Sequence, residues 1–286
     1  MKLQFIPVFR LSVLLPLLLA GCSGADAPDA AGSPADVSLW QPATTRAVAG
    51  DVATIAGYAS ADASTPAFSA DVEYRADNIW YWQSGSYTPP LSGVKVLAAS
   101  IPTVSMTQGT ATLFQYDIKD YSRGLMLGAV PYADGVTVIP VHHRLARIDI
   151  SCKGSHWLNT SLYLYLANSA DVDFPRGTLT TNAGKSDYLQ QMQDSRTATL
   201  TIFPQTFHRG DVLFHYRYGS STYSYTLKKD YVVGANQCLY VKIASGDEDS
   251  DPDPTPPDPP VVDVEISVAS IVSPWEQGGS QSGDAE

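Results

Sequence analysis

Short runs of alternating apolar and polar residues recur along the middle of the chain, and they constrain its fold more than any other feature. In the clearest run, residues 144–152, the apolar side chains of Ala146, Ile148, Ile150 and Cys152 share one parity and polar residues share the other. Side chains of a β-strand alternate between its two faces, so this run predicts a strand with one buried face. Further candidate strands lie at residues 71–74, 79–83, 94–100, 110–116, 125–130, 136–141, 162–167, 197–203, 212–218, 222–228 and 238–243.

The spacing of these runs predicts an all-β fold. Turn-forming clusters separate them at the intervals typical of β-sandwiches, and Asp134-Gly135 is a good hairpin turn. Only residues 188–192 look helical. Because so many strands exceed one simple sandwich, we divide the body of the chain into two comparable domains, residues 47–135 and 136–244.

The formal net charge of −11 belongs to the C-terminal tail. Residues 245–286 hold eleven acidic residues and no Lys or Arg, which leaves eighteen acidic and eighteen basic residues in the rest of the chain. A neutral body with an acidic tail cannot neutralise phosphate, which argues against a nucleic-acid-binding protein. Within the tail, residues 245–260 are acidic and Pro-rich, so they predict an extended, semi-rigid linker.

The last alternating run, residues 261–272, follows this linker. Its apolar side chains fall on one parity, namely Val262, Val264, Ile266, Val268 and Val272. A lone strand is unstable in water, so this one needs the edge of a sheet. That sheet can be the chain's own, or it can belong to a neighbouring subunit that accepts a donated strand in a head-to-tail filament. Both possibilities stay open for the C-terminal strand and tail, residues 261–286.

The N-terminus has the pattern of an export signal. The basic residues Lys2 and Arg10 precede an apolar run, residues 11–20, that is too short to span a bilayer. The run leads into Gly21-Cys22, which resembles the bacterial lipobox. We therefore predict a signal peptide at residues 1–21, a lipid on Cys22, and a small-residue, acidic tether after it.

Several motifs follow one another in an order that resembles a known family. After the lipobox come Thr44-Thr45-Arg46, an aromatic N-terminal half, and then GLMLGA at 124–129, VHHRLARIDI at 141–150, IFPQ at 202–205 and SPWE at 273–276. This ordered set is similar to the fimbrillin-like proteins of Bacteroidales, the lipoprotein-derived subunits of type V pili. The chain departs from the family pattern in its long Pro-rich linker and in Arg123-Gly124, where an acidic residue is expected.

The resemblance implies two transthyretin-like β-sandwich domains in tandem and a structural role in a pilus, at a stalk or tip position. It also implies that an arginine-specific protease cuts after Arg46, leaves Ala47 as the new terminus and removes the lipidated segment, residues 22–46. Residues 37–40 would be lost with that segment, or would act as a plug until removed. The expected partners are then other pilus subunits, the protease and, before processing, the outer membrane; the mature subunit would lie in the fimbrium.

Two pairs of residues suggest further sites. Trp80 and Trp82 share one parity of their run, so they either pack in a core or form an exposed platform for sugar rings. Cys152 and Cys238 either form a disulfide, which an exported protein permits, or are small buried or half-buried thiols; their different parities weaken the case for the bond.

Enzymatic motifs are missing from the sequence. The adjacent His142 and His143 point to opposite faces of a strand, and no metal-ligand spacing or catalytic or cofactor-binding motif is present. We therefore expect no metal, no cofactor and no enzyme activity. The alternative function is a monomeric, lipid-anchored cell-surface protein that binds, for example, glycans.

Overall fold

The computed structural model describes residues 38–40, 49–84, 91–118, 124–133, 138–153, 161–191, 196–218, 221–245 and 262–271. Its described residues form strands and no α-helix, which confirms the predicted all-β class, and none of them could span a membrane as a helix. The strands are β1 (Ser38–Trp40), β2 (Val52–Tyr58), β3 (Phe68–Tyr74), β4 (Trp80–Ser84), β5 (Val96–Ile101), β6 (Thr110–Phe114), β7 (Met126–Pro131), β8 (Val138–Pro140), β9 (His142–His143), β10 (Ala146–Lys153), β11 (Ser161–Ala167), β12 (Ser169–Asp173), β13 (Thr178–Thr181), β14 (Lys185–Gln191), β15 (Thr197–Ile202), β16 (Gln205–Phe207), β17 (Val212–Tyr218), β18 (Ser221–Thr226), β19 (Tyr231–Val233), β20 (Gln237–Ser245) and β21 (Val262–Ser270).

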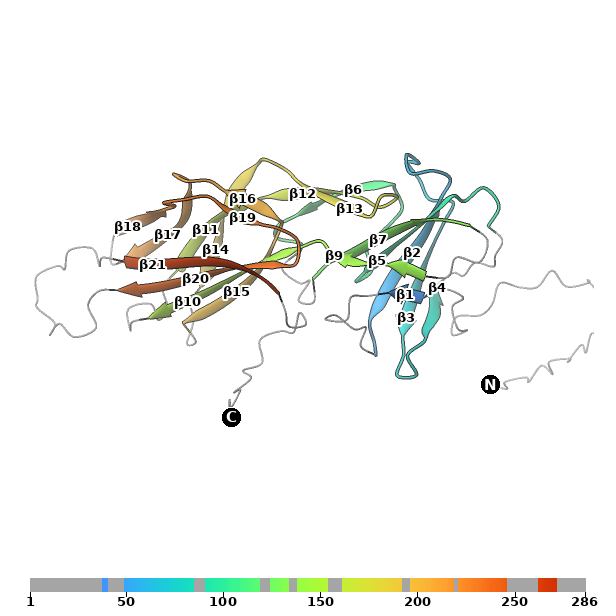
Figure 1. The fold of residues 1–286 in the computed structure, drawn as a ribbon, viewed down its shortest axis with the longest axis horizontal. Coiled ribbons are helices and arrows are strands. Elements are labelled where there is room, and N and C mark those ends of the chain that lie inside the picture. Colours follow the sequence, from blue (N-terminus) through green and yellow to red (C-terminus); the bar gives the residue numbers. More distant parts are fainter. Residues whose placement is uncertain are drawn as a thin grey trace, which may run out of the picture.

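A six-stranded antiparallel sheet, in the order β4-β3-β2-β5-β7-β9, forms most of the N-terminal half (Figure 1). The short parallel pair β1–β8 packs against one face of this sheet. Between the two layers lies a core of buried side chains that includes Leu39, Ile55, Val72, Leu97 and Ile139. The β1–β8 layer is therefore thin, with two strands facing six.

The C-terminal half is a sandwich of two four-stranded sheets. One has the order β15-β10-β20-β21 and the other β14-β11-β17-β18. Inward side chains of both sheets share one core, which contains Ile148 and Ile150 from β10 and Leu162 and Leu164 from β11. The burial pattern of β10 alternates along its length, as the sequence predicts.

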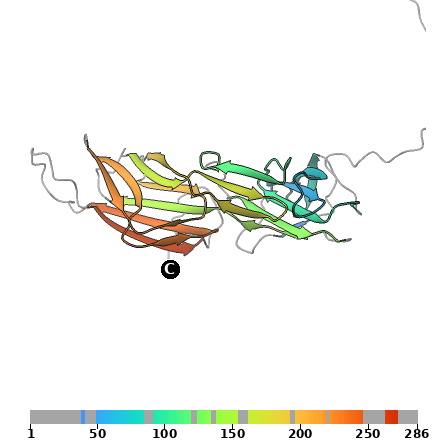
Figure 2. The same cartoon turned by 90° about the horizontal axis from the view of Figure 1, so that it is seen from above.

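A third core joins the two halves. β6 from the first half pairs with β12 from the second, in the sheet β13-β12-β6. Its inward side chains meet the second face of the six-stranded sheet, and Cys238 and Ile271 reach the same cluster. Seen from above, the two halves lie end to end along the long axis of the molecule (Figure 2).

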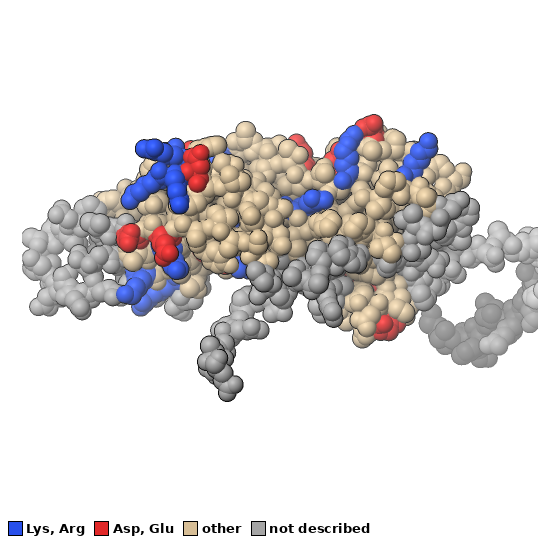
Figure 3. Space-filling view, viewed as in Figure 1, with Lys and Arg blue, Asp and Glu red and all other residues tan. Residues whose placement is uncertain are grey.

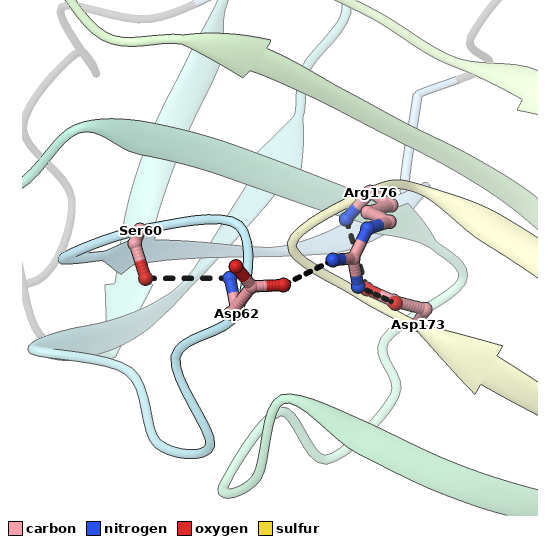
Figure 4. A network of polar contacts seen from close by, with 4 residues as sticks. All are labelled: Ser60, Asp62, Asp173 and Arg176. Atoms are coloured by element: carbon pink, nitrogen blue, oxygen red, sulfur yellow. Dashed lines mark hydrogen bonds and ion pairs between the residues drawn. The ribbon is translucent and has the colours of Figure 1, made fainter.

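An ion-pair network on the surface also bridges the halves. Arg176, in the turn between β12 and β13, contacts Asp62 in the β2–β3 connection and Asp173 at the end of β12 (Figure 4). Within its own loop, the main-chain N–H of Asp62 donates a hydrogen bond to Ser60 Oγ at 3.3 Å. Arg176 and Asp62 are exposed and Asp173 is partly exposed, so water screens the network and its contribution to stability is small.

The surface of the body mixes both signs of charge. On the face shown in Figure 3, Lys and Arg lie beside Asp and Glu near both ends of the molecule. This mixture matches the neutral body expected from the sequence, and it provides no single-sign field for a polyanion.

The structure bears on two sequence expectations, a short helix at residues 188–192 and a domain boundary at 135/136. Residues 188–191, expected to be helical, belong to β14, because seven register positions pair this strand with β11 and Tyr188 packs on the C-terminal core. Tertiary pairing overrides the weak local tendency. The domain boundary at 135/136 stays a prediction, and β8, β9 and β12, which follow it, pair with β1, β7 and β6, which precede it. Asp134-Gly135 lies outside the described residues.

Candidate strand-exchange site

The first candidate site is β1, which lies on the N-terminal side of Arg46. It pairs in parallel with β8, with Leu39 opposite Ile139. The Leu39 side chain is 8% exposed and belongs to the N-terminal core, so this short strand fills part of that core. That residues 37–40 act as a plug until they are removed stays a prediction, and residue 37 lies outside the described residues.

A glycine of β7 allows β8 to pack closely on the six-stranded sheet. A Cβ atom at Gly128 of β7 would collide with the carbonyl oxygen of Pro140. The missing side chain therefore lets the thin β1–β8 layer approach the six-stranded sheet closely. Val138 of β8 is exposed, whereas Ile139 and Val141 are buried.

Trp80 and Trp82 belong to the same core and do not form an exposed binding surface. Each is 3% exposed, and both point inward from β4 together with the core residues of the N-terminal half. Of the two alternatives that the sequence left open, the structure has core packing, and a sugar-binding platform at these two residues is wrong. Period-two alternation explains the result, because it sends both rings to the buried face.

The second candidate site is β21, at the edge of a C-terminal sheet. It pairs antiparallel with β20 along nine register positions, from Gln237↔Ser270 to Ser245↔Val262. Val264, Ile266 and Val268 are half-buried and pack against the C-terminal core, while Asp263 and Glu265 point to solvent. The inward face predicted for this strand is therefore the one that the structure buries, in the chain's own sheet.

The end of β21 is anchored at the junction. Ile271 is 5% exposed in the core that joins the two halves, and its N–H donates to the Asn236 carbonyl oxygen at 2.9 Å. On the solvent face, Lys242 Nζ lies 3.4 Å from Glu265 Oε2, in an exposed ion pair. Detaching this strand therefore opens both the C-terminal core and the junction core.

The two body cysteines are free thiols, so the suggested disulfide is wrong. In the parallel pair β10–β20, Cys238 is opposite Arg147 and Cys152 is opposite Ile243. Five strand residues separate the two thiols, about 16 Å, which is far beyond disulfide reach. Burial raises the pKa of Cys152 to about 12 and that of Cys238 to about 11, so neither is a reactive thiolate.

A buried histidine belongs to β9, the strand that follows β8 in the sequence. His143 of β9 pairs with Met126 and is 6% exposed. Burial, with a contribution from neighbouring His142, lowers its pKa to about 4. Among the described residues, no group of three or more His, Cys, Asp or Glu side chains could hold a metal ion.

Several predicted site residues lie outside the described residues. They are Cys22, Arg46, Ala47 and Val272. The backbone of Val262 pairs with Ser245 at the start of β21.

Comparisons with known proteins identify a shared fold. No protein-family profile and no curated protein match the chain. A solved structure from Bacteroides uniformis, a protein provisionally assigned to cell adhesion, covers 87% of this chain and all of its own, with a TM-score of 0.52 and 13% identity. One from Bacteroides ovatus, with the same provisional assignment, has the same coverage, a TM-score of 0.51 and 11% identity.

A third structure is more distant. The tip fimbrial protein Mfa3 of Porphyromonas gingivalis, with a C-terminal truncation, covers 84% of this chain and 98% of its own, at a TM-score of 0.44 and 9% identity. The two Bacteroides matches agree with the resemblance found in the sequence as far as the fold is concerned. At such low identity, what the two Bacteroides structures establish is that this chain shares their fold.

Proposed function

We propose that the chain is a structural subunit of a fimbria, exported as a lipoprotein, cut after Arg46 and polymerised by donation of its C-terminal strand. The observation that carries the proposal is the position of β1. It is the plug of the N-terminal core, and a cut after Arg46 would sever its only covalent connection to the body. The two Bacteroides proteins that share the fold, with their provisional assignment to cell adhesion, agree with a surface role.

β21 offers the N-terminal core more apolar side chains than β1 does, and the contacts that it leaves in its own subunit have to be replaced by those that it makes in the neighbour. β1 fills the core with Leu39, whereas β21 carries three half-buried aliphatic side chains and ends beside buried Ile271. Fully burying one such side chain contributes about 1.5–3 kcal/mol. A tethered plug competes at a high local concentration, and a cleaved one diffuses away. Proteolysis would therefore convert a reversible competition into a one-way exchange.

The test combines proteolysis with a labelled donor peptide. The chain, with or without an arginine-specific protease, is mixed with a fluorescent peptide of residues 261–272, and anisotropy reports binding. We expect binding after the cut and none before it. The Arg46→Gln variant is the matched control, because it keeps the fold and removes the cleavage site.

The donor side is tested on an unboiled gel. The cut chain should form a ladder, and the Ile266→Asp variant should not, because it puts a carboxylate on the inward face of β21. Ser267→Asp, on the solvent face of the same strand, should still form the ladder. A cut chain that stays monomeric and does not bind the peptide refutes the proposal.

A second candidate function is favoured by the pairing of β21 in its own sheet. A monomeric, lipid-anchored surface binding protein needs no strand exchange and would keep this arrangement permanently. In that case Arg46 resists cleavage, the lipid on Cys22 stays attached, and the chain remains on the outer membrane. Intact mass of the protein recovered from cells distinguishes the two, because the fimbrial subunit starts at Ala47.

A further inference from the structure

The outward face of β6 carries an aromatic pair that no core uses. Ala111 and Leu113 point inward to the junction core, whereas Phe114 and Tyr116 point to solvent. Phe114 is 44% exposed and Tyr116 is 61% exposed. Their ring centroids lie 5.8 Å apart and their planes differ by 13°, so the two rings are nearly parallel.

The backbone under this pair is held rigidly. Gln115, which lies between the two aromatic residues in the sequence, is 5% exposed. Its main-chain N–H donates to the Asn168 carbonyl oxygen at 2.9 Å, and its Nε2 donates to the Thr201 carbonyl oxygen at 2.6 Å. A platform fixed in this way loses little conformational entropy when a ligand binds to it.

Hydroxyl, carboxylate and amide groups surround the pair. On β6, Thr112 Oγ1 donates to Asp171 Oδ1 of β12 at 2.6 Å. Ser169, the register partner of Phe114, accepts a hydrogen bond from Asn182 Nδ2 at 3.1 Å. The Asp171 carboxylate can accept hydrogen bonds, and the exposed Thr112 hydroxyl can accept one while it donates to Asp171.

We propose that this face is a binding site for neutral carbohydrate. Sugar rings would pack their apolar faces on Phe114 and Tyr116, and their hydroxyl groups would bind Asp171 and its neighbours. Within the described parts of β6, β12 and β13 and the two residues that follow β6, no large apolar side chain other than Phe114 and Tyr116 is exposed. A protein partner usually needs a wider apolar centre to its interface, whereas a sugar needs only an aromatic surface with polar groups around it.

The proposal does not rest on strand exchange. β6 belongs to the junction sheet, separate from β1 and β21 (Figure 1). Loss of the aromatic pair should therefore leave the peptide binding and ladder formation described above unchanged.

Affinity electrophoresis of the exported chain tests the proposal. Native gels contain mannan, galactan, xylan, β-glucan or dextran, and retardation of the band reports binding. We expect at least one of these to retard the wild type, and the Phe114→Ala/Tyr116→Ala variant to bind it about tenfold more weakly or not at all. Tyr165→Ala is the matched control, because Tyr165 is an exposed aromatic residue on another sheet.

Each outcome decides the matter. Retardation that the double variant loses and Tyr165→Ala keeps, with an unchanged melting temperature in both, supports the site. Three results overturn it: no polysaccharide retards the wild type, the double variant is retarded equally, or the pair binds an arginine-rich peptide by cation–π contact and no polysaccharide.

Discussion

Gly177 occupies a close contact between the β12–β13 turn and β7. It lies in the turn between β12 and β13 with a φ of +59°, in the left-handed region. A Cβ atom there would lie 2.8 Å from both the Ala129 nitrogen and the Gly128 carbonyl carbon of β7. Both are backbone atoms, so they cannot rotate away as a flexible side chain would.

The cost of Gly177→Ala has two separable parts. An alanine in the left-handed region costs about 1–2 kcal/mol. Overpacking against backbone adds about 1–3 kcal/mol. Gly93 provides the matched control, since its φ is +78° and a Cβ there would meet nothing within 4 Å. We therefore expect a loss of about 2–5 kcal/mol for Gly177→Ala and of about 1–2 kcal/mol for Gly93→Ala.

Urea unfolding followed by tryptophan fluorescence measures both variants. The difference between them isolates the contact of the β12–β13 turn with β7. If the two alanine variants unfold at the same urea concentration, the turn does not press on β7, and the tight junction described above is wrong.

Three further predictions concern pH, the edge strand and the thiols. His143 has a pKa of about 4 when folded and about 6.5 when unfolded, so the unfolded chain binds an extra proton between these pH values. Stability should therefore fall by about 3 kcal/mol as the pH drops from 6.5 to 4. The urea midpoint should depend less on pH in the His143→Gln variant, and an equal dependence in that variant contradicts the assignment. Ile266→Ala should lower stability by about 1–3 kcal/mol through lost contacts with the C-terminal core, whereas Ser267→Ala on the solvent face should change it little, and thermal melts compare the two. A thiol reagent should label Cys152 and Cys238 only after denaturation, and reduction should leave the intact mass of the body unchanged; a gain of two mass units would show a disulfide.

Much of the fold was predictable from alternation alone. The inward face of β10, from Ala146 to Cys152, and the inward face of β21, from Val264 to Val268, follow directly from period two. The outward position of Phe114 could have been found in the same way, since it shares the parity of Thr110 and Thr112. What was missed there is a large aromatic side chain on a face that is otherwise polar.

The residues of the candidate sites were less predictable, because burial depends on what covers a face. Trp80 and Trp82 have one parity in either interpretation, and only the β1–β8 layer and its neighbours decide that they are buried. The spacing of Cys152 and Cys238 in the sequence also left a bond possible. The parallel register of β10 and β20 separates them by five residues.

The sequence by itself determined that this chain forms strands, which side chains of each strand share a face, and that an acidic Pro-rich segment precedes a last apolar strand. These are local properties, set by backbone geometry and solvation within a few residues. Only the tertiary structure decided the neighbours: β6 with β12 across the two halves, β1 with β8, and β21 with β20. Strand pairing joins residues that are far apart in the chain, and many partners satisfy the same alternation, so the choice falls to the packing of the whole molecule.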